Sequence, residues 1–543
     1  TGRISYTCVR PILTEIVMTQ TKRDVFVTVL EKLAVFILLA AFMFVTVHAY
    51  ITTYSMDIFN GCNEHFELMY DSLFVNLLLL FAFILLSALI APVVRRFTPV
   101  ECIVLILIWF VGMGFAWVMS ARTLTGADSQ IVFDAAVAAS KNDFSKLSDA
   151  YFKDYPFQLG FAFVIEMLYR ILPNLEGPTA AQYLNVFCLA ATMCGLVLIT
   201  KLAFPEKKAY AYVTLLAILC VQPIPFLMFV YGNIPALACG VYAVLFFLLA
   251  ARDGRLWSRI VFALLAALML GLGVMLKYNS LIFTAALVIV AILKFIRRPK
   301  VYLPIFLAAA LSASVLMPAA VKKSYERRTG IEFGDGVPMT GWLAMGLSEA
   351  YNGPGWYNGT HTVSTYRKNN FDGEKTSEEA MATVRTRLEY FASSGAATRQ
   401  FFTVKIMSQW NEPTYQCLWQ NQVRAVDGNR TIPASLFCEP GSTGEILLKT
   451  YMNVIQQIIL FLFTAYVGFT FFRRGAACDL FPLFVIIVGG FLYHLLFEAK
   501  SQYVLTYFIL MLPAAGAALE MSVSRVRDAL SASRSRAHAK RSE

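Results

Sequence analysis

The residues Glu101–Ser120 (ECIVLILIWFVGMGFAWVMS) are followed closely by Gly126-Ala127-Asp128-Ser129. The first stretch has the length and the apolar composition of a helix that crosses a bilayer. An acidic side chain at the mouth of a membrane bundle is more costly than one in a solvated loop, so Asp128 indicates function. The alternative is that Asp128 caps a helix that starts near Ser129, because Asp is favoured at helix N-caps.

The composition predicts a membrane protein. The chain has 543 residues, of which 58% are hydrophobic and 15% are charged. Many apolar runs of about 18–22 residues accompany this composition, which favours a polytopic membrane protein over a soluble globule. The formal net charge of +11 does not indicate binding to nucleic acid, because an excess of Lys and Arg is expected on cytoplasmic loops. The partner that the sequence predicts first is therefore the lipid bilayer.

Apolar segments give the expected membrane helices. Their lengths are close to the roughly 20 residues that a helix needs to cross the hydrocarbon core. The segments are 26–48, 73–94, 101–120, 181–203, 209–229, 234–251, 257–276, 279–296, 301–320, 449–472, 479–497 and 501–521. The predicted fold is an all-α polytopic membrane protein with about twelve transmembrane helices.

Basic residues between these segments predict the orientation, because Lys and Arg are enriched in cytoplasmic loops. Arg95-Arg96, Arg297-Arg298 and the C-terminal tail are assigned to the cytoplasm. All basic loops agree with this assignment if Phe157–Leu172 lies at the outer interface instead of crossing the membrane. The resulting division is a cytoplasmic leader (1–25), two additional N-terminal transmembrane helices (26–97), a transmembrane module (98–321) with the first outer loop (121–180), an extracytoplasmic domain (322–448), C-terminal transmembrane helices (449–521) and a basic cytoplasmic tail (522–543).

Residues 322–448 are the only sizeable polar region, and we predict that they form a small mixed domain on the outer side. The segment Thr376–Phe391 has the apolar spacing of a helix. Cys417 and Cys438 are the only cysteines of this region. They form a disulfide if the compartment is oxidising, whereas the alternative is two buried thiols.

The unusual polar residues of the chain gather on the predicted outer side. Asp128 follows the third segment, and Asp154 precedes Tyr155-Pro156. Lys277 and Lys500 each lie at the end of an apolar segment. A lone Lys there is usually an anchor that reaches the membrane surface. Two such lysines on the same side as an acid fit a site for a phosphate group.

This order of features resembles the GT-C class of membrane glycosyltransferases, which use lipid-linked donors. It is most similar to protein O-mannosyltransferases and to the transferases that add aminoarabinose to lipid A (glycosyltransferase family 39 and its bacterial relatives). The resemblance covers roughly residues 100–521 and leaves the two N-terminal segments as an addition. Ser129 stands where relatives often have a second acid, Phe157 where they have a second Pro, and Gln502 where bacterial members have Arg.

The resemblance implies an inverting transferase in a bacterial plasma membrane, with its active site on the extracytoplasmic face. Its partners are a polyprenyl-phosphate sugar donor and a hydroxyl of a glycan, lipid or protein acceptor. One base and cations for the phosphate suffice for that chemistry. The implied site consists of catalytic Asp128, with Asp154 as the second choice, phosphate-binding Lys277, Lys500, Tyr278 and Tyr503, and substrate-binding Tyr155, Asn233 and Glu498. No residue spacing indicates a metal site, and a divalent metal ion stays open as a cofactor.

Other function classes stay as alternatives. A polysaccharide polymerase or ligase would use a lipid-linked glycan on the same side of the membrane. A secondary transporter is a common class among chains with this many segments, but the two halves show no inverted repeat. The long insertion 322–448 is also unusual for a transporter. A non-catalytic partner in a membrane assembly is the remaining alternative.

Overall fold

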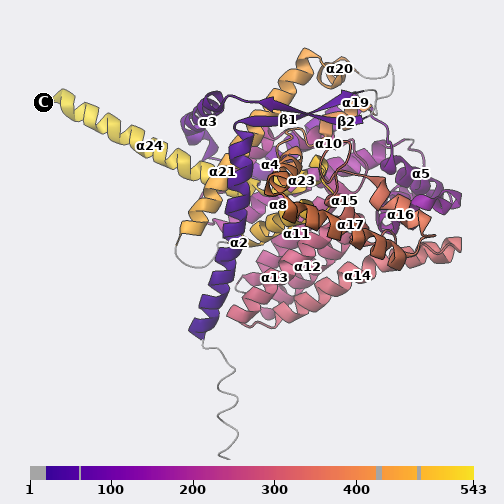
Figure 1. The fold of residues 1–543 in the computed structure, drawn as a ribbon. Coiled ribbons are helices and arrows are strands. Elements are labelled where there is room, and N and C mark those ends of the chain that lie inside the picture. Colours follow the sequence, from indigo (N-terminus) through magenta and orange to yellow (C-terminus); the bar gives the residue numbers. More distant parts are fainter. Residues whose placement is uncertain are drawn as a thin grey trace, which may run out of the picture.

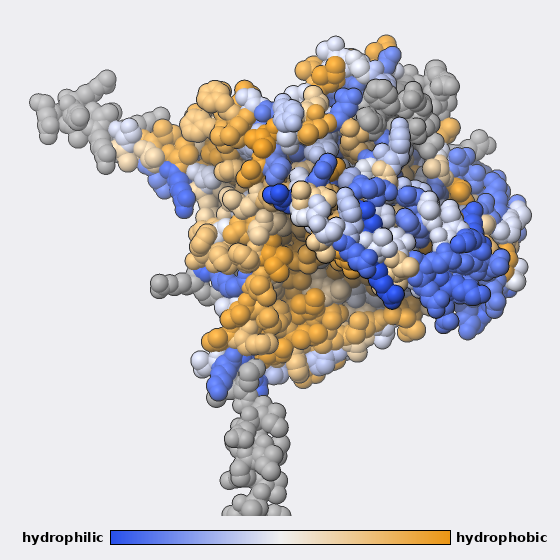
Figure 2. All heavy atoms as spheres, viewed as in Figure 1, coloured by the Kyte–Doolittle hydropathy of each residue, from blue (hydrophilic) through white to orange (hydrophobic). Residues whose placement is uncertain are grey.

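The structure is a computed structural model that describes residues 20–59, 63–175, 177–252, 254–423, 431–473 and 479–542. Most of the predicted leader, 1–19, lies outside these residues. The described chain is a bundle of helices with one small sheet (Figure 1). Apolar side chains cover a broad surface over α12 and α13, and hydrophilic ones gather over α5 and α16 (Figure 2).

Nine helices in the described residues are long and apolar enough to cross a membrane. They are α2 (Gln20–Ala49), α3 (Leu73–Val94), α4 (Pro99–Ala121), α8 (Thr179–Ala203), α11 (Asn233–Ala251), α12 (Leu256–Leu276), η3 with α13 (Tyr278–Ser280 and Leu281–Arg297), α14 (Tyr302–Thr329) and α21 (Thr443–Phe472). The pair α23 (Ser501–Leu510) and α24 (Leu512–Ser542) is bent by 49° and is apolar enough to be either a broken tenth span or a re-entrant loop. The predicted fold class is confirmed.

Two shorter apolar helices, α9 (Ala209–Leu219) and α22 (Phe481–Leu496), occupy the remaining predicted segments. Each apolar segment predicted from the sequence thus contains a helix, although α9 ends at Leu219 and fills only the first half of 209–229. The count of twelve spans stays a prediction. The predicted start of the third span at Glu101 is two residues late, because Thr98 and Glu101 form a capping box at the start of α4.

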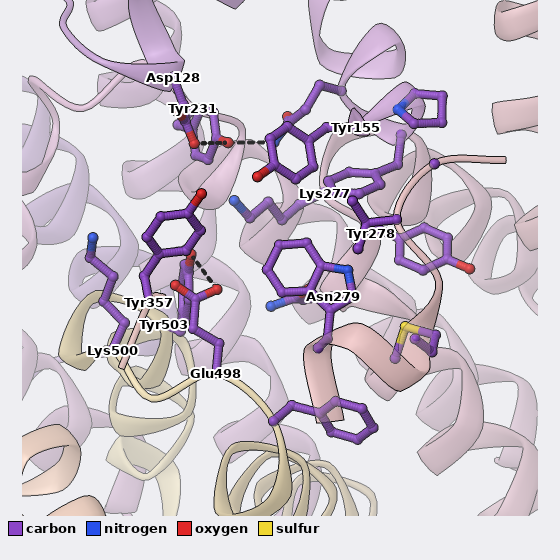
Figure 3. A pocket seen from close by; sticks show the side chains of 18 of the residues that line it. Asp128, Tyr155, Tyr231, Lys277, Tyr278, Asn279, Tyr357, Glu498, Lys500 and Tyr503 are labelled. Carbon is purple, nitrogen blue, oxygen red and sulfur yellow. Dashed lines mark hydrogen bonds between the residues drawn. The ribbon is translucent and has the colours of Figure 1, made fainter. Parts of the chain in front are cut away.

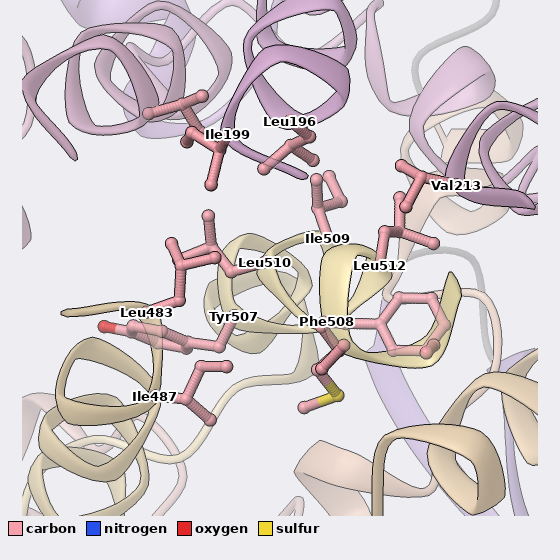
Figure 4. Packing of buried hydrophobic residues seen from close by; sticks show 14 of the residues in the cluster. Leu196, Ile199, Val213, Leu483, Ile487, Tyr507, Phe508, Ile509, Leu510 and Leu512 are labelled. Carbon is pink, nitrogen blue, oxygen red and sulfur yellow. The ribbon is translucent and has the colours of Figure 1, made fainter. Parts of the chain in front are cut away.

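The centre of the bundle is apolar (Figure 4). Side chains from α8, α9, α22, α23 and α24 meet there, including Leu196, Ile199, Val213, Leu483, Ile487, Tyr507, Phe508, Ile509, Leu510 and Leu512. Gly490 lets α22 approach α23, because a Cβ at this position would lie 2.3 Å from the ring of Tyr507. This packing holds α22 and α23 together, and the segment between them therefore has a fixed place.

A two-stranded antiparallel hairpin connects the two N-terminal helices. Its strands are β1 (Thr52–Phe59) and β2 (Asn63–Tyr70), paired from Thr52 with Tyr70 to Phe59 with Asn63. The sequence analysis expected mixed structure in residues 322–448 instead. The described residues of that region form helices and turns only, so the predicted mixed character is wrong there, and the sheet lies in the loop between the first two spans.

The described part of 322–448 begins with the end of α14, which Gly330 terminates in a left-handed conformation. The helices that follow are α15 (Met339–Gly346), η4 (Gly359–His361), α16 (Val363–Lys368), α17 (Gly373–Ser393), α18 (Gly395–Trp410), α19 (Cys417–Val423) and α20 (Ile432–Cys438). The helix predicted over Thr376–Phe391 is confirmed as part of α17. Cys417 and Cys438 are both buried. Cys417 is a free thiol, so the predicted disulfide between the two residues is not formed.

The first outer loop contains several short helices, which are α5 (Asp128–Ser140), η1 (Ser145–Ser148), α6 (Ala150–Asp154), η2 (Pro156–Gln158) and α7 (Leu159–Ile171). Residues 221–231 contain the further short helix α10 (Pro223–Phe226). At 1.5 Å per residue, the 13 residues of α7 span about 20 Å, which is less than a bilayer core of about 30 Å. The length of α7 therefore supports the prediction that this segment does not cross the membrane.

Candidate active site

A cavity of about 1240 Å³ opens where α5, α12 and α22 meet α15 and α17. Small-molecule sites commonly measure about 300–1,000 Å³, so this cavity has room for groups from two substrates. Most of the predicted site residues line it, namely Asp128, Tyr155, Lys277, Tyr278, Glu498, Lys500 and Tyr503 (Figure 3). The structure thus brings together residues from the first outer loop, the middle of the chain and its C-terminal part.

Asp128 is the first residue of α5, and its side chain lines the cavity. The N-cap is Ala127, which has a φ of 49° and makes no side-chain hydrogen bond. The hydroxyl of Ser129 closes this turn by donating to the carbonyl of Gly126 at 2.8 Å. Capping by Asp128, the alternative left by the sequence, is therefore wrong. Its carboxylate instead accepts a hydrogen bond from the hydroxyl of Tyr231 at 3.2 Å.

Tyr231 is a site residue that the sequence analysis did not predict. Its hydroxyl lies 2.9 Å from that of Tyr151 and accepts a hydrogen bond from Gln158 Nε2 at 2.6 Å. This network holds the phenol that contacts Asp128. The polar run Tyr231-Gly232-Asn233 between two apolar segments is the only sequence signal for it.

Lys277 follows α12 directly, and close backbone contacts fix its position. A Cβ added to Gly160 or Gly232 would lie 1.9 or 2.4 Å from carbonyl oxygens in the last turn of α12. The end of α12 is therefore wedged between two glycines. The ammonium group of Lys277 lies 4.0 Å from the ring centre of Tyr231 and 5.6 Å from that of Tyr503. It lines the cavity, which differs from the anchoring role that a lone Lys at a helix end usually has.

The environment of Lys277 favours loss of its proton. Burial lowers the pKa of Lys277 to about 7, although the carboxylates of Glu498 and Asp128 oppose burial. An ammonium group that is held with little water around it interacts strongly with an anion that enters the cavity. Lys277 is therefore suited to bind a phosphate group.

Glu498 and Lys500 lie in the segment between α22 and α23. Burial raises the pKa of Glu498 to about 7. Burial opposes the charge of Lys500, but the carboxylates of Glu64 and Glu498 outweigh it and raise the pKa of Lys500. Lys500 Nζ forms an ion pair with Glu64 Oε1 at 2.7 Å. Glu64 belongs to β2 and was not predicted as a site residue.

Aromatic rings form much of the remaining wall. The ring of Tyr278 stacks on Phe157, with a centroid distance of 5.6 Å, and Tyr155 lies 5.9 Å from Trp342. The hydroxyl of Tyr503 donates to Glu498 Oε2 at 3.4 Å. Flat apolar faces with polar edges can stack on a sugar ring, so this wall complements the charged groups.

Two predicted residues do not line this cavity. Asp154 is fully buried and accepts hydrogen bonds from the guanidinium of Arg367, and its backbone carbonyl accepts from Val337 N at 3.0 Å. Asp154 therefore contacts Arg367 and does not reach the cavity. Asn233 is buried at the start of α11 and lines a small neighbouring cavity of about 30 Å³ together with Lys277. Among the described residues, no group of three or more His, Cys, Asp or Glu could hold a metal ion.

Comparison with known proteins identifies the class of enzyme. The sequence model of the family described as dolichyl-phosphate-mannose-protein mannosyltransferase matches residues 156–318, a region that contains Tyr231 and Lys277. The protein is a GT-C glycosyltransferase. The predicted resemblance and the predicted enzyme class are confirmed by that match.

Comparisons with a solved structure and with curated proteins carry less information about the class of enzyme. The crystal structure of ArnT from Cupriavidus metallidurans bound to undecaprenyl phosphate is 10% identical in sequence, and the similarity covers 78% of this chain and 77% of that one. The TM-score of this similarity is 0.35. No curated protein matches this sequence.

Proposed function

We propose that this glycosyltransferase moves a sugar from a polyprenyl-phosphate donor to a hydroxyl group of a glycan, lipid or protein, on the extracytoplasmic face of the membrane. The observation that carries the proposal is the shared cavity of Asp128, Lys277 and Lys500, at the ends of membrane helices. The matched family uses dolichyl-phosphate mannose, which is a donor of this kind. The distribution of basic loops supports the outer face.

The chemistry is a single displacement at the anomeric carbon. The acceptor oxygen forms a bond to that carbon as the bond between the carbon and the phosphate oxygen breaks. Asp128 takes the proton of the acceptor hydroxyl as general base. The electron pair of the broken bond stays on the polyprenyl phosphate, whose charge Lys277 and Lys500 stabilise. Attack from the face opposite the phosphate inverts the configuration.

The hydrogen bond from Tyr231 gives Asp128 a fixed orientation without neutralising it. A carboxylate held by one neutral donor keeps free lone pairs for the acceptor hydroxyl. The aromatic wall around Tyr155 and Tyr278 would hold sugar rings between the base and the lysines.

The test is transfer from a polyprenyl-phosphate sugar by purified Asp128→Asn protein. Asn keeps the shape and still accepts the hydrogen bond from Tyr231, but it cannot accept the proton. We expect transfer to fall by about 10² or more with donor binding unchanged. Asp134→Asn is the matched control, because Asp134 lies on the same helix and forms an exposed ion pair with Lys146. Near-normal transfer by Asp128→Asn would remove Asp128 as the base.

A further inference from the structure

The N-terminal hairpin reaches the donor side of the cavity. Glu64 on β2 lines the cavity, and its carboxylate is 2.7 Å from the ammonium of Lys500. The exposed fractions of the two side chains are 10% and 17%, so water screens this ion pair little. The hairpin lies outside residues 156–318, the region that matches the glycosyltransferase family.

Several contacts attach the hairpin to the rest of the protein. The backbone N–H of Tyr54 donates to the carbonyl of Asn411 at 3.1 Å. Met56 packs with Trp356 and Ala499 in a small buried cluster. The ring of Phe66 on β2 meets Trp356 at a centroid distance of 4.4 Å. These contacts make the approach of Glu64 to Lys500 part of the folded structure.

Acidic side chains outnumber lysines in the cavity around Lys500. Seven acidic residues of the described chain line the cavity, whereas its lysines and arginines in the same residues are Lys277 and Lys500 alone. The acids are Glu64, Asp128, Asp335, Asp372, Glu374, Glu378 and Glu498. A phosphodiester donor would add one more negative charge beside Lys500. Two anions that share one buried cation repel each other, so one of them must leave or become neutral.

We propose that Glu64 competes with the donor phosphate for Lys500, so that the N-terminal hairpin is part of the donor site and sets the affinity for the donor. This inference rests on the proposed function, because it needs Lys500 to be a phosphate ligand. Glu64 occupies the cation when the cavity is empty, and the donor displaces its carboxylate on binding. The role of Glu64 is thus opposite to that of a residue that helps to bind the phosphate.

The test is binding of the methyl phosphodiester of geranylgeraniol to the full-length protein in detergent, measured by calorimetry. This probe lipid carries one negative charge and no sugar. Glu64→Gln should bind it about tenfold more tightly than the wild type, because an adjacent like charge has been removed. Glu67→Gln is the matched control, since Glu67 is exposed on the same strand, and it should bind like the wild type. Unchanged or weaker binding by Glu64→Gln would overturn the inference.

A second pair of variants separates this inference from the proposed function. The double variant Glu64→Gln with Lys500→Gln leaves neither partner of the buried ion pair charged, so it avoids an uncompensated charge. It should bind the probe lipid more weakly than Glu64→Gln alone. Equal binding by these two proteins would show that Lys500 is not a phosphate ligand, and both proposals would then fail at this residue. Weaker binding by the double variant, without tighter binding by Glu64→Gln alone, would overturn only the role of Glu64.

Discussion

Two clusters of buried charge in this protein contain similar groups but differ in how those groups are paired. In the first, Glu166 on α7 accepts two hydrogen bonds from Arg328, at 2.6 and 2.9 Å, one from Arg170 at 3.0 Å and one from Tyr325 at 2.6 Å. In the second, which is the cavity cluster, Lys277 lies against aromatic rings.

The different pairing has opposite effects on the two buried acids. Burial raises the pKa of Glu166, but its hydrogen bonds from Arg328, Tyr325 and Arg170 outweigh burial and the pKa is lowered. Burial raises the pKa of Glu498 to about 7. A fully paired carboxylate stabilises the fold, whereas the partly paired groups of the cavity keep capacity to bind a charged ligand.

The largest expected effect is on the fold. Glu166→Gln removes the charge that pairs with two arginines and should lower the free energy of unfolding by about 3 kcal/mol. Transfer activity per folded molecule should stay near that of the wild type. Thermal unfolding in detergent and an activity assay on the surviving protein measure the two quantities. A large loss of activity at full stability would contradict the distinction between the clusters.

The complementary change in the cavity is Lys277→Met. It removes the proposed phosphate ligand, so the probe lipid should bind about tenfold more weakly. The unfolding temperature should not decrease, because a buried cation that lies against aromatic rings contributes little stability. Calorimetry and thermal unfolding on the same preparation test both parts. A less stable protein that binds the probe lipid normally would give Lys277 a structural role.

The pairing of Asp154 is intermediate between that of Glu166 and that of the cavity groups. It pairs with Arg367, whose side chain is 46% exposed, and one of its buried carboxylate oxygens has no hydrogen-bond partner within the described structure. Burial raises the pKa of Asp154 although Arg367 opposes it, so the pair contributes little net stability. Asp154→Asn should therefore cost less than about 1 kcal/mol and leave transfer unchanged. Loss of transfer would restore Asp154 as a catalytic candidate.

The smallest expected effect is a dependence of donor binding on pH. Lys277 and Glu498 both have a pKa of about 7. As the pH rises from 6 to 8, Lys277 loses its positive charge and Glu498 gains a negative one, beside Asp128 and Lys500. Both changes disfavour an anion, so the probe lipid should bind roughly fivefold more weakly at the higher pH. Its phosphodiester does not titrate in this range, and Lys277→Met should show a shallower dependence.

The sequence was sufficient to predict the membrane helices and many of the residues that line the cavity. Apolar runs report burial in lipid directly, and each predicted segment contains a helix, although the predicted 209–229 is broken after Leu219. Asp128, Lys277 and Lys500 stood out because charged residues are rare at the ends of such runs. The orientation of the basic loops predicted that they lie on the same side of the membrane, and the structure adds that they line one cavity.

The pairing of those charges was not predictable in the same way. Glu64 meets Lys500, and Asp154 meets Arg367, across long separations that no local periodicity encodes. The hairpin itself left a signal that was missed, since Asn60-Gly61, a dipeptide typical of hairpin turns, lies between two strand-like runs. The alternative interpretation, in which Asp128 caps the helix, was wrong because the hydroxyl of Ser129 closes the turn instead.

The ion pair between Glu64 and Lys500 joins residues from nearly opposite ends of the chain. During synthesis, the hairpin leaves the ribosome long before the segment after α22 exists, and it must wait for its partner. Contacts of such high sequence separation are slow to form. A truncated chain that ends with α22 therefore has Asp128 and Lys277 but not Lys500. The cavity therefore gains its last charged wall only after the segment that follows α22 has been made.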